Sequence, residues 1–166
     1  MLQINLVEVN GYDNERLIIL KESLKIIETV INSDQFKETV LNFPFHFRSG
    51  LFGYMKDTYY TNQEIYSMIM NANETHGNVS NGSMDLYLVL KNGSDGNIVG
   101  YGNQNEKEIY TYKEIFDLKK PKEIANHITH EWTHKLGFTH AEITSSFGNR
   151  NNSVPYAIGN MIEDLN

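Results

Sequence analysis

One stretch in the C-terminal third of the sequence most constrains the fold, because it is typical of a helix with two chemically different faces. Pro121 suits the first turn of a helix, and Gly137 suits the position just past its end. At about 100° per residue, His127, His130 and His134 fall on one face. The opposite face is apolar and consists of Ile124, Ala125, Ile128, Trp132 and Leu136. We therefore expect a helix that is anchored by its apolar face and lines a polar site with its histidines.

The spacing of His130, Glu131, His134, Gly137 and His140 is HExxHxxGxxH, which is typical of a metal site. Two imidazoles one helical turn apart can both reach a zinc ion at about 2.0–2.1 Å. A third ligand cannot come from the next turn, so the chain must leave the helix and bend back. Gly137 permits this bend because glycine adopts left-handed backbone conformations without a steric penalty. We therefore expect His140 to approach the same ion from the loop.

Three neutral histidine ligands leave a fourth tetrahedral position for water, which is typical of a catalytic zinc and not of a closed structural one. Glu131 lies beside the first ligand, near the edge of the same face. There it could accept a proton from the zinc-bound water and later pass it to a leaving amine. His127 lies one turn before His130, too far to join the same ion, and we expect it beside the site or in solvent.

The signature of these five residues resembles that of the metzincin clan of zinc metallopeptidases, over about a quarter of the chain when the C-terminal tail is included. The resemblance implies an α+β, zincin-like single domain spanning residues 1–166, with a mixed twisted sheet and two long helices. It implies an N-terminal subdomain at residues 1–136, which includes the active-site helix, and a small C-terminal subdomain of loops at residues 137–166. It also implies that a protein or peptide substrate binds in extended conformation along a sheet edge, for which Val99, Gly100 and Tyr101 are the candidates.

Two residues of the C-terminal tail are candidates through the same resemblance. Met161 is the only methionine after His140, and in metzincins a methionine turn lies beneath the zinc. Alternatively, Met161 is a core residue of a terminal helical turn. Tyr156 follows a proline in an expected loop and corresponds to a tyrosine that some metzincins use to stabilise the developing oxyanion. Alternatively, Tyr156 is an aromatic residue that packs on this loop.

The rest of the chain predicts helices and strands in an α+β or α/β arrangement with one mixed sheet. Thr61 and Glu64 have the spacing of a capping box at the start of a helix. The other expected helices cover residues 14–32 and 35–43, and the expected strands cover residues 2–9, 85–90, 97–101 and 108–113. We expect a polar loop at residues 71–83, an extended segment at residues 44–50 and a hairpin turn, in preference to a calcium loop, at residues 92–97.

The composition excludes several classes of partner and site. A formal net charge of −7 disfavours a surface that binds nucleic acid. The chain has no cysteine, so any metal must be bound by His, Asp or Glu. No stretch approaches the roughly 18 uninterrupted apolar residues of a membrane span. We see no export signal in the sequence, which leaves a secreted and a cytoplasmic location both open.

The sequence as a whole predicts a zinc-dependent endopeptidase in which Glu131 activates the zinc-bound water. A second hypothesis keeps Zn²⁺ but assigns the chain to effector or interaction domains without proteolytic activity, because the sequence ends five residues after Met161. A third, a structural domain without metal, is the one that we favour least.

Overall fold

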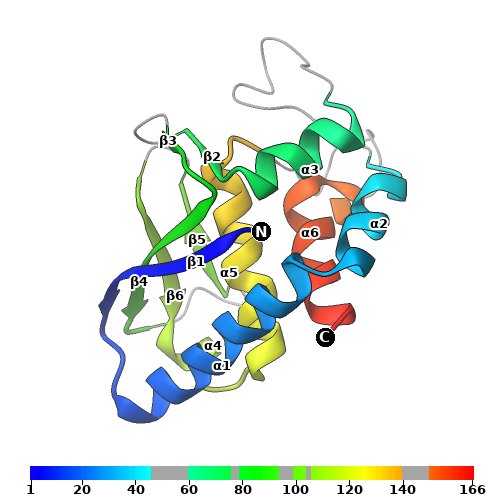
Figure 1. The fold of residues 1–166 in the computed structure, drawn as a ribbon. Coiled ribbons are helices and arrows are strands. Elements are labelled where there is room, and N and C mark those ends of the chain that lie inside the picture. The colour runs from blue at the N-terminus through cyan, green and yellow to red at the C-terminus, as the bar shows by residue number, and fades with distance from the viewer. Residues whose placement is uncertain (46–59, 76–78, 94–98, 104–105, 140–149) are drawn as a thin grey trace.

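A four-stranded mixed sheet forms one side of the molecule (Figure 1). The computed structural model describes residues 1–45, 60–75, 79–93, 99–103, 106–139 and 150–166. The order of the strands in this sheet is β1 (Gln3–Asn10), β4 (Ser83–Lys91), β6 (Glu108–Tyr112) and β5 (Gly100–Gly102). β1, β4 and β6 are parallel, whereas β5 is antiparallel to β6. The prediction of a mixed sheet is thus confirmed, and β5 forms one edge of it.

The described residues form six α-helices, so the α+β class is confirmed for one small domain. The helices are α1 (Asn14–Ile31), α2 (Asp34–Asn42), α3 (Asn62–Met70), α4 (Lys113–Phe116), α5 (Pro121–Lys135) and α6 (Val154–Asp164), and a short 3₁₀ helix, η2 (Arg150–Asn152), precedes α6. Side-chain caps explain where several of them begin. Thr61 and Glu64 form the predicted capping box of α3, and Asp13 accepts a hydrogen bond from the amide of Arg16 at the start of α1. None of the described helices is long and apolar enough to cross a membrane.

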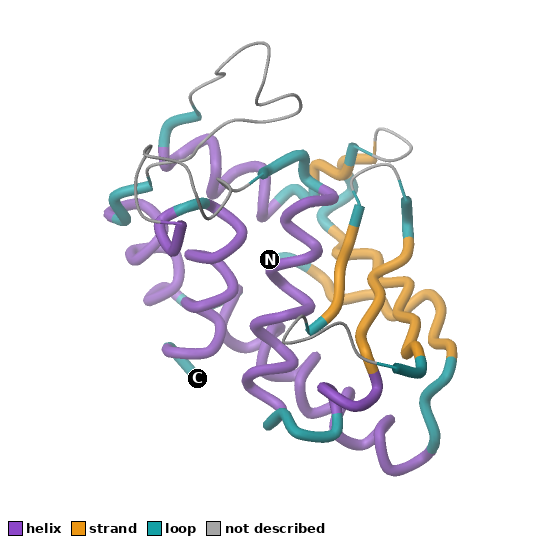
Figure 2. Tube along the Cα trace, turned by 180° about the vertical axis from the view of Figure 1, so that it is seen from behind, coloured by secondary structure: helices purple, strands orange, loops and turns teal. Residues whose placement is uncertain are grey.

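Helix α5 lies in the middle of the molecule, between the sheet and the helices α1 and α6 (Figures 1 and 2). Its predicted apolar face is buried throughout: Ile124, Ala125, Ile128, Trp132 and Leu136 are at most 2% exposed. The indole nitrogen of Trp132 donates a hydrogen bond of 2.8 Å to Glu74, so the one polar atom of this side chain is also satisfied. Packing on both sides therefore fixes how α5 is rotated about its axis.

The prediction of a C-terminal loop region is wrong for residues 154–164, which form α6. The apolar side chains of this segment recur every three or four residues and pack against α5. Gly159 allows the two helices to approach closely, because a Cβ there would overlap the side-chain oxygen of Asn126. Met161 is a buried residue of α6. The methionine-turn prediction is therefore corrected in favour of its alternative, a core residue of a terminal helix.

Two further predictions are corrected by the pairing of the strands. The segment expected to be a polar loop contains two short antiparallel strands, β2 (Asn73–Glu74) and β3 (Val79–Ser80). The prediction that residues 92–97 form a hairpin turn is wrong, because a hairpin would pair β4 with β5. Instead, β6 lies between these two strands and pairs with both. The expected extended segment falls largely outside the described residues.

The charged side chain of Lys135 is buried in the interior, with only 3% of the residue exposed. Its ammonium group donates hydrogen bonds of 2.8 Å to the carbonyl oxygens of Asn103 and Glu108, and a further one to that of Glu106. These carbonyls belong to the connection between β5 and β6 and to the first residue of β6. Lys135 therefore ties the end of α5 to the edge of the sheet.

We expect Lys135→Met to lower the free energy of unfolding by about 2–4 kcal/mol, because three backbone carbonyls lose a charged donor. Urea unfolding followed by circular dichroism measures this loss. The matched control is Lys25→Met, which replaces an exposed lysine of α1 and should change stability little. Equal unfolding midpoints for the two variants would show that the buried ammonium group contributes nothing.

Candidate metal centre

His130 and His134 lie one turn apart on α5, with their ring centroids 5.2 Å from each other. Together with Glu131 they form a group in which one possible ligand atom from each residue lies within 4.8 Å of the other two. Helical spacing alone brings these three side chains together, as the sequence predicts. His140, the expected third ligand, lies outside the described residues.

The end of α5 holds the imidazole of His134 in one orientation. Gly137 has φ of 90°, its amide donates to the carbonyl of His134, and the amide of Phe138 donates to that of Thr133. These bonds form a Schellman motif, so the predicted role of Gly137 in ending the helix is confirmed. The carbonyl of Phe138 lies 2.7 Å from Nδ1 of His134 and can only accept a hydrogen bond. In the neutral ring Nδ1 therefore carries the proton, and Nε2 has the lone pair that a metal requires.

Glu131 is a buried carboxylate, only 8% exposed, between α5 and the sheet edge. Its Oε2 accepts a hydrogen bond of 2.7 Å from the amide of Gly102, and its Oε1 lies 4.0 Å from Nε2 of His130. Burial raises the pKa of Glu131 to about 8, although the bond from Gly102 and the nearby charge of Lys135 oppose this shift. The carboxylate therefore lies beside the histidines with one oxygen oriented by the protein backbone.

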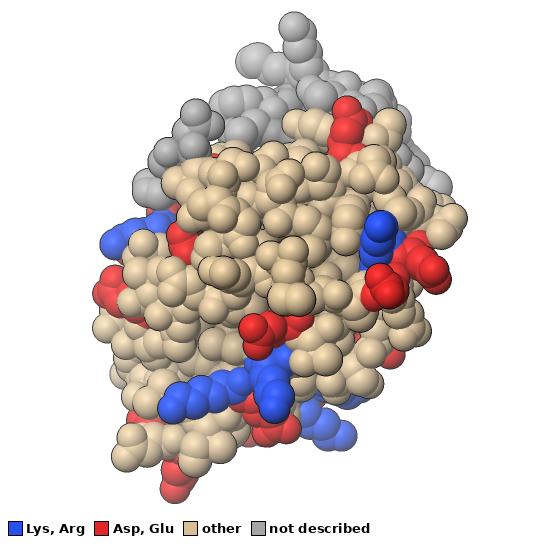
Figure 3. Space-filling view, in the orientation of Figure 1, with Lys and Arg blue, Asp and Glu red and all other residues tan. Residues whose placement is uncertain are grey.

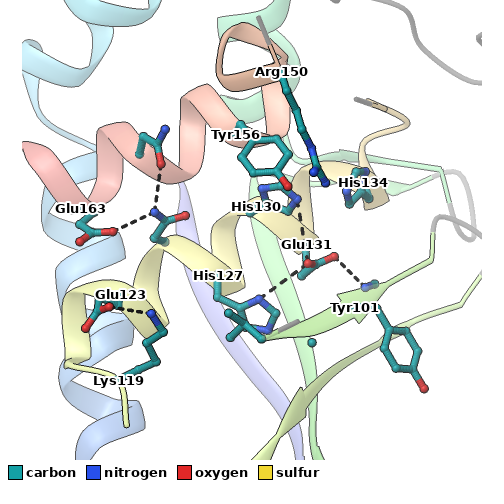
Figure 4. Close-up of a pocket in the computed structure, with 15 residues that line it drawn as sticks. Tyr101, Lys119, Glu123, His127, His130, Glu131, His134, Arg150, Tyr156 and Glu163 are labelled. Carbon is teal, nitrogen blue, oxygen red and sulfur yellow. Dashed lines mark hydrogen bonds and ion pairs between the residues drawn. The ribbon is translucent and has the colours of Figure 1, made fainter. Parts of the chain in front are cut away.

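His127 is buried behind Glu131, so the structure places it beside the site and not in solvent. Its Nε2 lies 3.1 Å from the hydroxyl of Thr111, and its Nδ1 lies 3.7 Å from Oε1 of Glu131 (Figure 4). Burial lowers the pKa of His127 to about 4, which keeps the imidazole neutral near pH 7. A neutral ring adds no charge to the wall of the site.

Strand β5 contacts α5 through two glycines at the point where Glu131 lies. A Cβ on Gly100 would overlap the carbonyl oxygen of Tyr110 and lie 2.8 Å from Nε2 of His127. A Cβ on Gly102 would lie 3.2 Å from Cβ of Glu131. The absence of side chains at both positions therefore lets the sheet edge approach the helix closely enough for the amide of Gly102 to reach the carboxylate.

β5, which contains residues predicted to bind the substrate, thus forms the edge of the described sheet nearest to Glu131. The carbonyl of Val99 accepts a hydrogen bond of 2.9 Å from the amide of Tyr112, which extends the pairing of β5 with β6. Tyr101 is 38% exposed, stacks on Tyr110 and accepts a hydrogen bond of 2.7 Å from the ammonium group of Lys91. Tyr101 therefore projects away from the helix, whereas Gly100 and Gly102 face it.

The C-terminal helix contributes an aromatic and a basic residue to the site. Tyr156 lies in the first turn of α6 and not in a loop, with its ring centroid 4.5 Å from that of His130. The guanidinium carbon of Arg150 lies 4.5 Å from the centre of the Tyr156 ring. The family resemblance of the sequence indicated Tyr156 but not Arg150, because no spacing rule connects a single arginine in η2 with a signature on α5.

These residues line a cleft of about 580 Å³, a volume typical of a ligand site. His130, Glu131 and His134 form one part of the cleft, together with β5, Tyr156 and Arg150 (Figure 4). The other part is polar and lies between α5 and α6. Its residues are Lys119, Glu123, Asn126, Asn160 and Glu163.

Hydrogen bonds organise the polar part of the cleft. Lys119 pairs with Glu123 at 2.8 Å, and the amide group of Asn126 donates to Asn160 at 3.2 Å and to Glu163 at 2.9 Å. On the face drawn in Figure 3, acidic and basic side chains are interspersed among neutral ones, and the described residues form no continuous basic surface on this face.

Comparison with known proteins finds no matching family model, no matching curated protein and no matching solved structure.

We expect Gly100→Ala to destabilise the protein more than Gly102→Ala does. The new methyl group at position 100 overlaps a backbone carbonyl that cannot rotate away, whereas at position 102 its nearest neighbour lies 3.2 Å away. Overpacking of this kind costs about 1–3 kcal/mol or more. Urea unfolding of both variants measures the difference, and an equal or larger loss for Gly102→Ala would contradict the tighter crowding of Gly100 against the backbone of β6.

Proposed function

We propose that this chain is a zinc-dependent endopeptidase of metzincin type, in which His130, His134 and His140 bind Zn²⁺ and Glu131 is the general base. The observation that carries the proposal is the convergence of His130, Glu131 and His134 in a cleft beside a sheet edge. The orientation of His134 adds independent support, because its hydrogen bond to Phe138 leaves Nε2 as the metal-binding nitrogen.

The described donors fit zinc better than they fit calcium or magnesium, which prefer sets of oxygen ligands. A zinc ion bound by three imidazoles would polarise the scissile carbonyl and lower the pKa of a water molecule towards about 7. Glu131 would then accept a proton as the water oxygen attacks the carbonyl carbon. When the C–N bond breaks, Glu131 would return this proton to the leaving amine, so that no covalent enzyme intermediate is required.

The surroundings of Glu131 suit this role. The bond from the amide of Gly102 holds one carboxylate oxygen, which leaves the other directed toward His130. Burial raises the pKa of this carboxyl group to about 8, but the positive charge of a zinc ion bound by His130 and His134 would lower the pKa again and favour the ionised carboxylate. The neutral ring of His127 behind it adds no charge. The chain thus supplies an oriented proton acceptor beside the proposed ligands.

Two other features support a peptide substrate. An extended peptide could pair with β5, the edge strand that runs past Glu131. Val99, Gly100 and Tyr101 would then form the strand that the substrate extends. The hydroxyl of Tyr156, whose ring contacts His130, would stabilise the negative charge that develops on the carbonyl oxygen.

One observation favours the second hypothesis, a zinc-binding interaction domain without proteolytic activity. The amide of Gly102 lies at the edge of the sheet but is already bonded to Glu131, so it cannot pair with a peptide at the same time. In that alternative the cleft binds a partner and Glu131 serves only to fix β5. The two hypotheses differ in whether the zinc-loaded protein cleaves any peptide bond.

We expect Glu131→Gln to retain one zinc ion per chain and to lower the cleavage of casein by about 10²–10⁴-fold, because the proton acceptor is lost while the proposed ligands remain. Zinc content is measured by plasma mass spectrometry and cleavage by release of soluble peptides. Glu28→Gln is the control, because it removes an exposed carboxylate of α1. Undiminished cleavage by Glu131→Gln would refute the mechanism, and a zinc-loaded wild type that cleaves nothing would favour the interaction domain.

A further inference from the structure

Arg150 is a cationic side chain in the part of the cleft that His130, Glu131 and His134 line. It begins η2, and its carbonyl accepts hydrogen bonds of 3.0 Å and 2.7 Å from the amide and the hydroxyl of Ser153. These bonds connect the backbone of Arg150 to Ser153, the N-cap residue of α6. In Figure 4 the side chain extends past the ring of Tyr156 into the cleft. Arg150 is thus held in place by the same helix that brings Tyr156 to His130.

The guanidinium group of Arg150 has hydrogen-bonding capacity that its described neighbours do not use. Its Nε is buried and has no hydrogen-bond partner among the described residues. No carboxylate of the described residues lies within 4.0 Å of the guanidinium group either, whereas Lys119, the other cation that lines the cleft, is paired with Glu123. A buried donor without an acceptor is costly, and a ligand that supplies the acceptor would recover this cost.

The shape of the guanidinium group determines which kind of ligand fits. Its central carbon lies 4.5 Å from the centre of the Tyr156 ring, and its N–H groups lie in one plane. These N–H groups form a fork that matches the two oxygens of a carboxylate. Because the whole chain carries a net charge of −7, an anionic substrate gains no general attraction from the protein and depends on such a local cation.

We propose that Arg150 binds a carboxylate group of the peptide substrate close to the scissile bond. This inference rests on the proposed function, since it assigns a substrate class to the same cleft. The carboxylate can come from an Asp or Glu side chain or from the C-terminus of the peptide. The first source makes the enzyme selective for acidic residues next to the bond that it cleaves, and the second directs it to bonds near a C-terminus.

The test compares matched peptides on two forms of the zinc-loaded protein. The peptides are based on a sequence that the protein cleaves in casein, or on a randomised sequence if casein is not cleaved. In one pair the two peptides differ only by Glu or Gln near the scissile position. In the other pair they differ only by a free or an amidated C-terminus. Wild type and Arg150→Gln are compared by kcat/KM. Binding is measured by fluorescence anisotropy in the Glu131→Gln background, with and without Arg150→Gln, so that it does not depend on turnover.

We expect Arg150→Gln to weaken binding, and to lower kcat/KM, by about 10–100-fold for the peptide whose carboxylate contacts Arg150. The amide counterpart of that peptide should lose much less, since its neutral amide group forms no ion pair with Arg150 and lacks the second oxygen of a bidentate contact. Arg150→Lys should recover part of the loss, because it keeps the charge but lacks the planar fork. Lys25→Gln, which removes an exposed positive charge from α1, should alter neither peptide. Which pair of peptides responds identifies the source of the carboxylate.

Three results would overturn the inference. Equal losses for the carboxylate and the amide peptides would show that Arg150 acts on the reaction centre or on the fold. No loss for either peptide, or no binding of any carboxylate peptide, would show that Arg150 does not recognise this group. Failure of the proposed function has a different signature, because peptides would then remain uncleaved by the wild type while the anisotropy measurements still decide the role of Arg150.

Discussion

The burial of one face of α5 is the constraint on which the rest of the structure depends. Trp132, Ile128 and Ile124 are fully buried between the sheet and two other helices, and each such side chain contributes about 1.5–3 kcal/mol. Rotation of α5 about its axis would expose these residues and is therefore strongly opposed. The same packing that stabilises the fold thus fixes His130 and His134 in the cleft, and the position of the site follows from the core.

Hydrogen bonds to backbone groups orient three side chains of α5. The carbonyl of Phe138 orients His134, the amide of Gly102 orients Glu131, and Lys135 ties α5 to the connection that follows β5. Backbone groups of a packed fold move little, so side chains that bond to them are held in one orientation. Such preorganisation is what both metal binding and general-base catalysis require.

The sequence predicts those features of the fold and site that depend on local spacing. The limits of α5 follow from a proline and a glycine at its two ends. The shared face of its histidines and the capping box at Thr61 follow from residues three to seven positions apart. Contacts between residues far apart in the sequence leave no spacing pattern from which they could be predicted. Lys135 bonds to carbonyls 27–32 residues away, and Gly102 to a carboxylate 29 residues away, so neither could be inferred from spacing. The apolar periodicity of α6 is present in the sequence, but the family resemblance places a methionine turn in the same residues and so predicts a loop there.

The proposed function requires three imidazoles to bind one zinc ion, with one coordination position left for water. X-ray absorption spectroscopy of the zinc-loaded protein, compared with its His140→Ala variant, tests it most directly. The account predicts four nitrogen or oxygen neighbours at about 2.0–2.1 Å, three of them with the outer-shell scattering of imidazole, and only two imidazoles in the variant. An imidazole count that is unchanged in His140→Ala, or a wild-type zinc ion surrounded by protein ligands alone, would contradict the account.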